Sequence, residues 1–116
     1  MILYGIKNCN TVKSAIEWLK KHAIVFEFYD YKKSGISKAK LGEWSKQVGW
    51  ESLVNKRGTT WRQLDQAVQK KVTSEKAAID LMSEKTSVIK RPLIENIGRV
   101  ILLGFDEAEY TKILKK

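Results

Sequence analysis

The spacing of apolar residues near the start of the chain predicts a strand, a helix and a second strand. Residues 2–6 form a short apolar run that ends at a polar stretch, which is typical of a buried strand. Apolar side chains then recur at the i, i+3, i+4 and i+7 positions of one helix face, namely Val12, Ala15, Ile16 and Leu19. We expect this helix to run from about Asn10 to His22, and residues 24–31, rich in Val, Phe and Tyr, to form the next strand. Such a unit favours parallel, right-handed pairing.

The middle of the chain has helical spacing and predicts a block of helices. Ser37 is placed to cap a helix that Gly49 would end, and Thr60 to cap a short one. A further helix is expected to start at Thr73 or Ser74 and to continue to about residue 85.

The last part of the chain returns to strands. Residues 88–94 form an extended segment that contains the only proline, and residues 99–103 form a second apolar run. The Asn and Gly within residues 95–98 suit a turn, so the two runs predict a hairpin. Asp106 and Glu109 form a capping pair for a final helix. The predicted order is β-α-β, a helical block, then β-β-α, an α/β fold.

Composition narrows the chemistry. The 116 residues suit one domain, and a single Cys and a single His exclude an internal disulfide, a multi-cysteine zinc site and a histidine triad on a metal. The net charge of +9, from 22 Lys+Arg against 13 Asp+Glu, favours anionic partners. No apolar run approaches the roughly 20 residues of a membrane helix. A lone thiol without an export signal predicts a cytoplasmic protein.

Cys9 lies between the first predicted strand and the first turn of the helix. There the free backbone N–H groups and the helix dipole stabilise an anion, so the thiol should have a lowered pKa and be present as thiolate. Lys7 and Lys13 would add positive charge. The alternative is that Cys9 is a small buried apolar side chain.

The same helix start is suited to an oxyanion. Asn10 and Thr11 would supply side-chain hydrogen bonds to it, unless they only cap the helix. Val12 stands where a dithiol oxidoreductase has its second cysteine. Any redox cycle must therefore use an outside thiol, such as glutathione or a small redoxin.

Arginine is the other residue type of interest. Arg91 directly precedes Pro92, in the one X-Pro bond of the chain, and its guanidinium suits a tetrahedral oxyanion or a carboxylate. The alternative is a solvated arginine beside a proline at a strand entry. Arg57 has the same chemistry, with a surface charge as the default interpretation.

The remaining side chains favour structural roles. We expect Trp18 to be a partly exposed aromatic on the helix face, and Trp44, Trp50 and Trp61 to belong to the core of the helical block. The lysines are spread along the chain without the aromatic interleaving of a nucleic-acid-binding sheet, which argues against direct nucleic-acid binding.

Three separated motifs resemble the ArsC/Spx family, with its YffB-like branch as the nearest match. They are residues 3–15 around the cysteine, Asn55-Lys56-Arg57-Gly58 with Trp61-Arg62, and Lys90-Arg91-Pro92-Leu93-Ile94. The resemblance implies a thioredoxin-like mixed sheet in one ArsC-like domain, residues 1–116. Its halves would be about 1–33 and 87–116, with a helical insertion at about 34–86.

The resemblance also implies chemistry. In the family's arsenate reductases, a cysteine at the position of Cys9 attacks arsenate, an arginine matching Arg91 binds the oxyanion, and one matching Arg57 assists. Glutathione and glutaredoxin then reduce the cysteine. The reductases carry a further arginine beyond the Arg-Pro pair that this chain does not match, which argues against arsenate. The Spx branch binds RNA polymerase and often carries a Cys-x-x-Cys switch, which Val12 removes.

Two hypotheses follow. The first is a cytoplasmic, glutathione-dependent thiol reductase without a metal. In it Cys9 is the catalytic residue, Arg91, Arg57, Asn10 and Thr11 bind substrate, Pro92 contributes to glutathione binding, and glutathione or glutaredoxin regenerates the thiol. The second is a non-enzymatic, Spx-like regulatory module that binds an acidic protein partner such as RNA polymerase.

Overall fold

A computed structural model describes residues 1–115 and divides the chain into two compact units. The first unit combines Met1–Ser34 with the chain from Arg91 onward, and the second is Gly35–Lys90. The chain thus leaves the first unit after Ser34 and returns to it at Arg91. That these units make up one ArsC-like domain remains a prediction.

The first unit is built on a mixed sheet with the order β2-β1-β3-β4. β1 (Ile2–Gly5) pairs in parallel with β2 (Glu27–Asp30) and antiparallel with β3 (Leu93–Asn96). β4 (Arg99–Leu103) extends the sheet by an antiparallel hairpin with β3, as predicted. The α/β class and the order of elements are confirmed.

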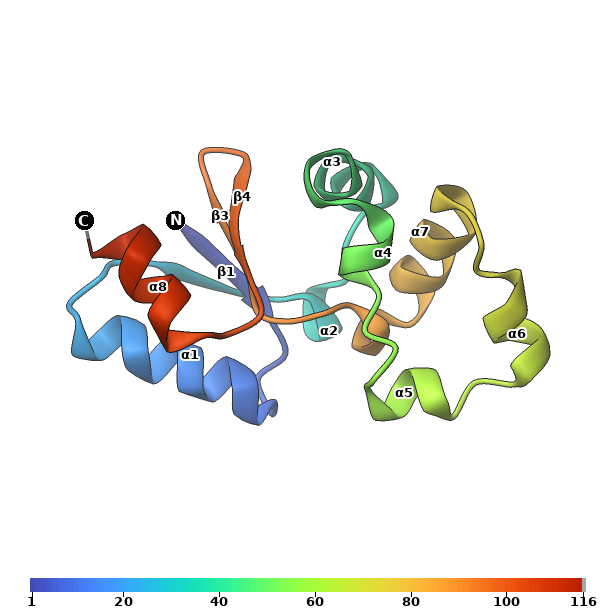
Figure 1. The fold of residues 1–116 in the computed structure, drawn as a ribbon, viewed down its shortest axis with the longest axis horizontal. Helices are drawn as coiled ribbons and strands as arrows, with labels where there is room; N and C mark the ends of the chain where they lie inside the picture. Colours follow the sequence, from blue (N-terminus) through green and yellow to red (C-terminus); the bar gives the residue numbers. More distant parts are fainter. Residues whose placement is uncertain (116) are drawn as a thin grey trace. The chain divides into compact units, whose positions relative to one another are not determined.

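Two helices share one face of this sheet. In Figure 1, α1 (Asn10–Lys21) lies below the strands, and α8 (Glu107–Leu114) lies above α1, at the level of β1. Their inward side chains and those of the strands form one core: Leu3, Val12, Ala15, Trp18, Leu19, Ile94, Leu102 and Tyr110. The predicted cap of the last helix is confirmed, since the Asp106 carboxylate accepts a hydrogen bond from the Glu109 amide at 3.1 Å.

The expected partial exposure of Trp18 is wrong. Its side chain is 5% exposed and meets the Tyr110 ring edge-on, with the ring centroids 5.5 Å apart. The partner comes from α8, at the far end of the chain, so the periodicity of α1 alone could not indicate this contact.

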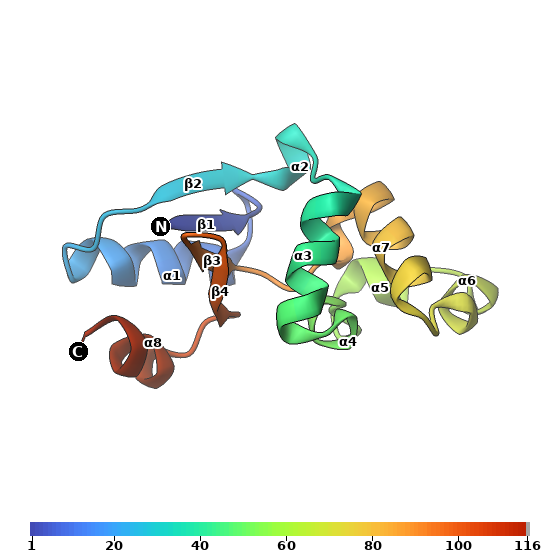
Figure 2. The same ribbon diagram turned by 90° about the horizontal axis from the view of Figure 1, so that it is seen from above.

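The second strand is shorter than the predicted residues 24–31. The Asp30 carboxylate accepts hydrogen bonds from the amides of Lys32 at 3.0 Å and Lys33 at 3.2 Å. This local bonding ends the strand and starts the helical turn α2 (Tyr31–Ser34). Figure 2 shows α2 directly after β2 at the end of the sheet.

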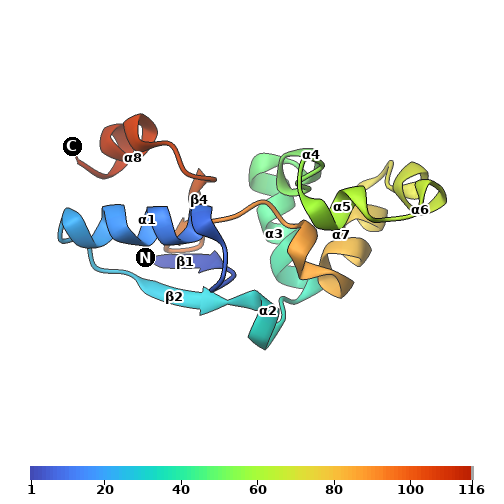
Figure 3. The same ribbon diagram turned by 90° about the horizontal axis from the view of Figure 1, so that it is seen from below.

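The second unit is helical. It contains α3 (Lys38–Val48), α4 (Trp50–Leu53), α5 (Thr59–Arg62), α6 (Gln66–Lys71), α7 (Glu75–Glu84) and the 3-10 turn η1 (Thr86–Val88), shown in Figure 3. Trp44 and Trp61 are buried in it, as expected, whereas Trp50, which was expected in the same core, is only partly buried.

Three predicted details of the helical block are confirmed and one is wrong. Ser37 and Ser74 cap α3 and α7, accepting the amides of Lys40 and Ala77, and Gly49 ends α3. The predicted cap at Thr60 is wrong, because Gly58 caps α5 and Thr60 lies within the helix. The short helices α4 and α6 were not anticipated, since each has too few residues to display a repeat.

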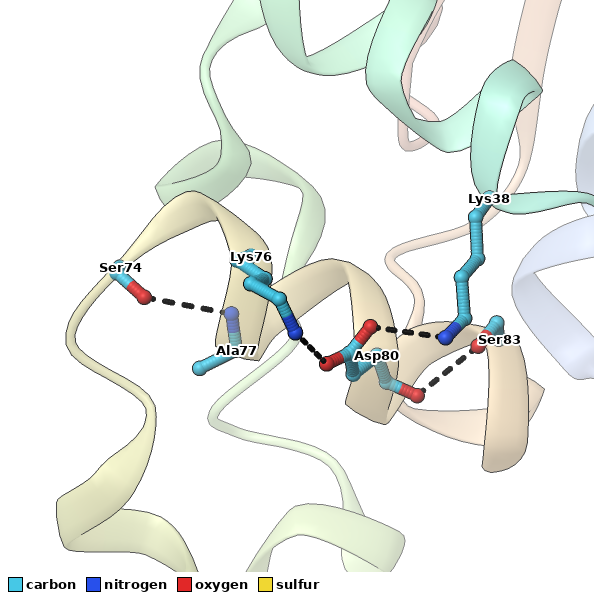
Figure 4. Close-up of polar contacts among 6 residues, drawn as sticks. All are labelled: Lys38, Ser74, Lys76, Ala77, Asp80 and Ser83. Carbon is cyan, nitrogen blue, oxygen red and sulfur yellow. Dashed lines mark hydrogen bonds and ion pairs between the residues drawn. The ribbon is translucent and has the colours of Figure 1, made fainter.

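Figure 4 shows how polar contacts connect two of these helices. Asp80 on α7 forms ion pairs with Lys38 of α3 at 3.0 Å and with Lys76 of α7 at 3.1 Å. All three side chains are substantially exposed, so these pairs add little stability.

The predicted extended segment 88–94 is divided. Val88 ends η1, Ile89 makes an isolated bridge to Val54, and the strand itself starts at Leu93. Among the described residues, no helix is long and apolar enough to cross a membrane.

Candidate active site around Cys9

The strand β1 and the start of α1 place Cys9 at a helix tip. Cys9 is the N-cap residue of α1: its backbone is extended, and its carbonyl oxygen accepts from the Lys13 amide at 2.9 Å. Gly5, at the end of β1, lets α1 approach closely, because a Cβ there would lie 2.9 Å from a Val12 methyl. The side chain of Cys9 is half-buried and its thiol is free.

Opposing effects act on the pKa of the Cys9 thiol, and those that lower it are larger in sum than the one that raises it. Burial raises the pKa of Cys9, but hydrogen bonds from the Val12 amide and from the Arg91 side chain, the Arg91 charge and the Thr11 amide together hold this pKa below its ordinary value. The predicted helix-tip stabilisation is therefore present as two backbone amides. Arg91 supplies the neighbouring charge that was expected from Lys7 and Lys13, whose side chains are exposed.

Strand pairing brings Arg91 to the cysteine. β3 pairs antiparallel with β1, and Arg91 lies two residues before β3, joined to Pro92 by a cis peptide bond. The Pro92 carbonyl oxygen accepts from the Gly104 amide at 2.7 Å, which fixes this turn to the end of β4. The structure thus unites Cys9 and Arg91, two predicted site residues that are far apart in sequence.

Tyr31 is a site residue that the sequence did not indicate. It is fully buried at the start of α2. Burial raises the pKa of Tyr31, and although the charge and a hydrogen bond of Arg91 lower it, the net shift is upward, with the charges of Cys9 and Asp30 adding to it. The phenol therefore stays neutral, and its oxygen accepts a hydrogen bond from the Arg91 guanidinium. In the sequence Tyr31 appeared as the last residue of a strand, which carries no signal of this role.

Asn10 and Thr11 lie in the first turn of α1 with exposed side chains. Neither caps the helix, because the N-cap is Cys9 and no side-chain cap bond forms. Thr11 contacts the thiol through its backbone amide. Substrate binding by these two side chains remains a prediction.

Arg57 belongs to the second unit. Its amide donates to the Asn55 side chain at 3.2 Å, in the loop before α5. A pocket of about 540 Å³ surrounds this loop and is lined by Glu51, Ser52, Val54, Asn55, Lys56, Arg57 and Lys90. The Lys56 ammonium also lies 5.5 Å from the Trp61 ring centroid. The pocket is basic, but a role of Arg57 beside Cys9 remains a prediction.

Metal chemistry has no evident site in the part of the chain that the structure covers. Among residues 1–115, no group of three or more His, Cys, Asp or Glu side chains is arranged to hold an ion. The side chains that the structure brings together at the site carry a thiol, a guanidinium and a phenol.

The site combines a single cysteine at a helix tip with an arginine that precedes a cis-proline, on a four-stranded mixed sheet. This combination defines an ArsC-like protein. The family model, described as the ArsC family, matches residues 4–113, and the chain belongs to this family.

Solved structures and a curated relative extend the comparison. The YffB protein is 44% identical, covers 97% of both chains and has a TM-score of 0.89. An arsenate reductase (ArsC) related protein from Brucella melitensis is 41% identical over 99% of this chain and 94% of its own, with a TM-score of 0.79. The global transcriptional regulator Spx of Streptococcus mutans is 28% identical over 98% of this chain and 82% of its own. The predicted kinship with YffB-like and Spx proteins is confirmed.

Proposed function

We propose that this protein is a cytoplasmic, glutathione-dependent thiol reductase that uses Cys9 as its single nucleophile. The observation that carries the proposal is the lowered pKa of Cys9 beside Arg91, which increases the fraction of the thiol present as thiolate, its nucleophilic form. Membership of the ArsC family supports the same class of chemistry.

The reaction has two balanced steps on a glutathione mixed disulfide. In the first, the Cys9 thiolate attacks the glutathione sulfur, a new S–S bond forms on Cys9, and the substrate leaves as its thiolate. In the second, the thiolate of another glutathione attacks this bond, releases oxidised glutathione and restores the Cys9 thiolate. The two electrons that reduce the substrate come from glutathione, and glutaredoxin is the alternative donor.

Arg91 has two roles in this scheme. Its guanidinium stabilises the thiolate before attack, and it offers a fork to a carboxylate of glutathione or to an oxyanionic substrate. Arg57, Asn10 and Thr11 would supply further contacts to the anion. Pro92 has no N–H, and its carbonyl oxygen already accepts a hydrogen bond from the Gly104 amide. Pro92 would therefore contribute by shaping the surface that glutathione contacts.

The test is a coupled assay with the mixed disulfide of glutathione and 2-mercaptoethanol, free glutathione, glutathione reductase and NADPH. We expect turnover by the wild type and none by Cys9→Ser. Ser14→Ala, an exposed change on the same helix, is the matched control and should turn over normally. A wild type without activity, or an active Cys9→Ser, would refute the proposal.

A second arm separates substrates. Arsenate replaces the mixed disulfide in the presence of glutathione and glutaredoxin. Since this chain does not match the reductases' further arginine, we expect arsenate turnover to be weak, on the order of a hundredfold or more below that of a full arginine set. Efficient arsenate reduction would identify the oxyanion as the substrate instead.

The second candidate function is a regulatory module that binds an acidic protein partner. Its specific support is the match to Spx over nearly the whole chain, together with the net charge of +9. Purified RNA polymerase, immobilised at moderate salt, is the probe. Under this alternative Cys9→Ser binds as the wild type does, and the coupled assay shows no turnover.

A further inference from the structure

The first unit has a groove whose lining includes none of Cys9, Tyr31 and Arg91. Its volume is about 550 Å³, and its apolar lining consists of Ile16 on α1 with Phe26 and Phe28. Its charged lining is Lys7, Lys20, Lys33 and Asp30. This size is within the range of ligand pockets, and the combination of aromatic and cationic side chains selects an anion with an apolar part.

The groove follows a free sheet edge. β2 is the outermost strand on its side of the sheet, as Figure 2 shows, and within residues 1–115 it pairs with β1 alone. The Glu27 amide donates to the Met1 carbonyl oxygen at 2.9 Å, on the β1 side. Because main-chain groups alternate in direction along a strand, those of Phe28 face outward. The edge thus offers a donor and an acceptor to an added strand.

The charge on the groove is not balanced within the described part of the chain. Lys7, Lys20 and Lys33 form no ion pair there. The one carboxylate, Asp30, already accepts two backbone amides through one of its oxygens. The rim is therefore cationic, beside an aromatic side chain, Phe28, that is 38% exposed.

We propose that this groove binds an extended acidic segment of a partner protein, which adds to the sheet as a strand beside β2. Main-chain bonds to Phe28 would give affinity, and side chains on the α1 side would give selectivity. The ten residue steps from Asn10 to Lys20 span about 15 Å along the helix, which an extended strand covers in about five residues. The segment therefore has acidic residues at both ends and an apolar residue between them, all on one face.

The probe is a fluorescein-labelled peptide, SETVTES, added to the full-length protein. We expect binding measured by anisotropy, with NMR shifts of Ile16, Phe26 and Phe28. SKTVTKS, which reverses the charge, should not bind. Absence of binding by SETVTES at about 1 mM, where even a weak site would be occupied, would overturn the proposal.

Two pairs of variants test the groove against net charge. Lys20→Glu and Lys33→Glu should each weaken binding about tenfold. Lys21→Glu and Lys32→Glu carry the same charge change on adjacent exposed residues that do not line the groove, and should stay within about twofold. Equal losses in both members of a pair would show non-specific attraction and refute the site.

Two further arms test the mode of binding and the kind of ligand. N-methylation of the central valine of SETVTES removes one strand hydrogen bond and should abolish binding, whereas unchanged affinity would refute strand addition. Dodecanoate or anionic phosphatidylglycerol vesicles that bind in a Lys20-dependent way, when the peptide does not, would assign the groove to an amphipathic anion or a lipid surface instead.

This inference is independent of the proposed reductase. Cys9→Ser should bind SETVTES as the wild type does, and Lys20→Glu should keep full turnover in the coupled assay. Loss of peptide binding and loss of reductase turnover can therefore be told apart.

Discussion

At the scale of single residues, the reactive group is a thiol whose burial is overcome by its neighbours. Two backbone amides at the tip of α1 and one guanidinium from Arg91 stabilise its charged form. The amides cannot be removed by mutation, whereas the guanidinium can. The effect of the guanidinium on the pKa of Cys9 can therefore be measured separately from that of the amides.

The pH dependence of Cys9 alkylation follows from the direction of its shift. A thiol with a lowered pKa remains thiolate at lower pH, so the midpoint of the iodoacetamide rate should fall below the value of about 8.5 for free cysteine. Arg91→Met should raise the midpoint, because the hydrogen bond and the charge of the guanidinium are lost while the burial that raises the pKa remains. A midpoint at or above 8.5 in the wild type would contradict the site described.

Tyr31 is a positioning residue, since it acts through Arg91. Tyr31→Phe keeps the ring in the core but removes the hydroxyl that accepts a hydrogen bond from the guanidinium. We expect turnover to fall several-fold and the alkylation midpoint to move, with about 0.5–1.5 kcal/mol lost from the free energy of unfolding. Tyr29→Phe, on the exposed part of β2, is the control. A loss of stability with an unchanged midpoint would mean that Tyr31 is only structural.

At the scale of elements, β1 and α1 pack closely on either side of the cysteine because Gly5 has no side chain. Gly5 has no Cβ, and the methyls of Val12 occupy the space where a Cβ would be. Valine is stiff at χ1, so it cannot easily move aside.

Gly5→Ala tests this close approach. The added methyl should cost about 1–3 kcal/mol in the free energy of unfolding, as overpacking does, measured by urea denaturation. Val12→Ala in the same chain should recover part of that cost, so the double mutant loses less than the sum of the two. Gly42→Ala is the control: nothing lies within 4 Å of its added Cβ, and alanine favours the α3 helix. Equal effects at Gly5 and Gly42 would refute the close packing.

The elements also show where local signals suffice. Ser37 and Asp106 were identified as helix caps from sequence, and Ser74 as one of two candidates with Thr73, because a cap requires only a side-chain oxygen and the amides that follow it. Tyr31 was misassigned to the end of a strand because the Asp30 turn, rather than strand propensity, determined its backbone.

At the scale of the whole molecule, the net charge of +9 attracts anions to the surface. This attraction is long-range and screened by salt, unlike the short contacts between Cys9 and Arg91. Reagents of different charge therefore separate the two effects.

The reaction of Cys9 with 5,5′-dithiobis(2-nitrobenzoate), a dianion, should slow markedly between about 0.01 and 0.3 M salt as the Debye length shortens. Its reaction with neutral iodoacetamide should change much less. If both rates respond equally, salt acts on the thiol itself, and the general field of the protein has no part in delivering anions to it.

The sequence by itself determined the order of the main elements, the capped starts of α3, α7 and α8, and the position of Cys9 at the start of α1. Each depends on neighbours within a few residues, such as an apolar period or an oxygen before a run of free amides. Only the tertiary structure decided that Arg91 and Tyr31 meet at the thiol, that Trp18 is buried under Tyr110, and that Phe28 lies in a basic groove on an open sheet edge. These contacts join segments distant along the chain, and they form because strand pairing and core packing lower the free energy of the whole unit, which no local pattern records.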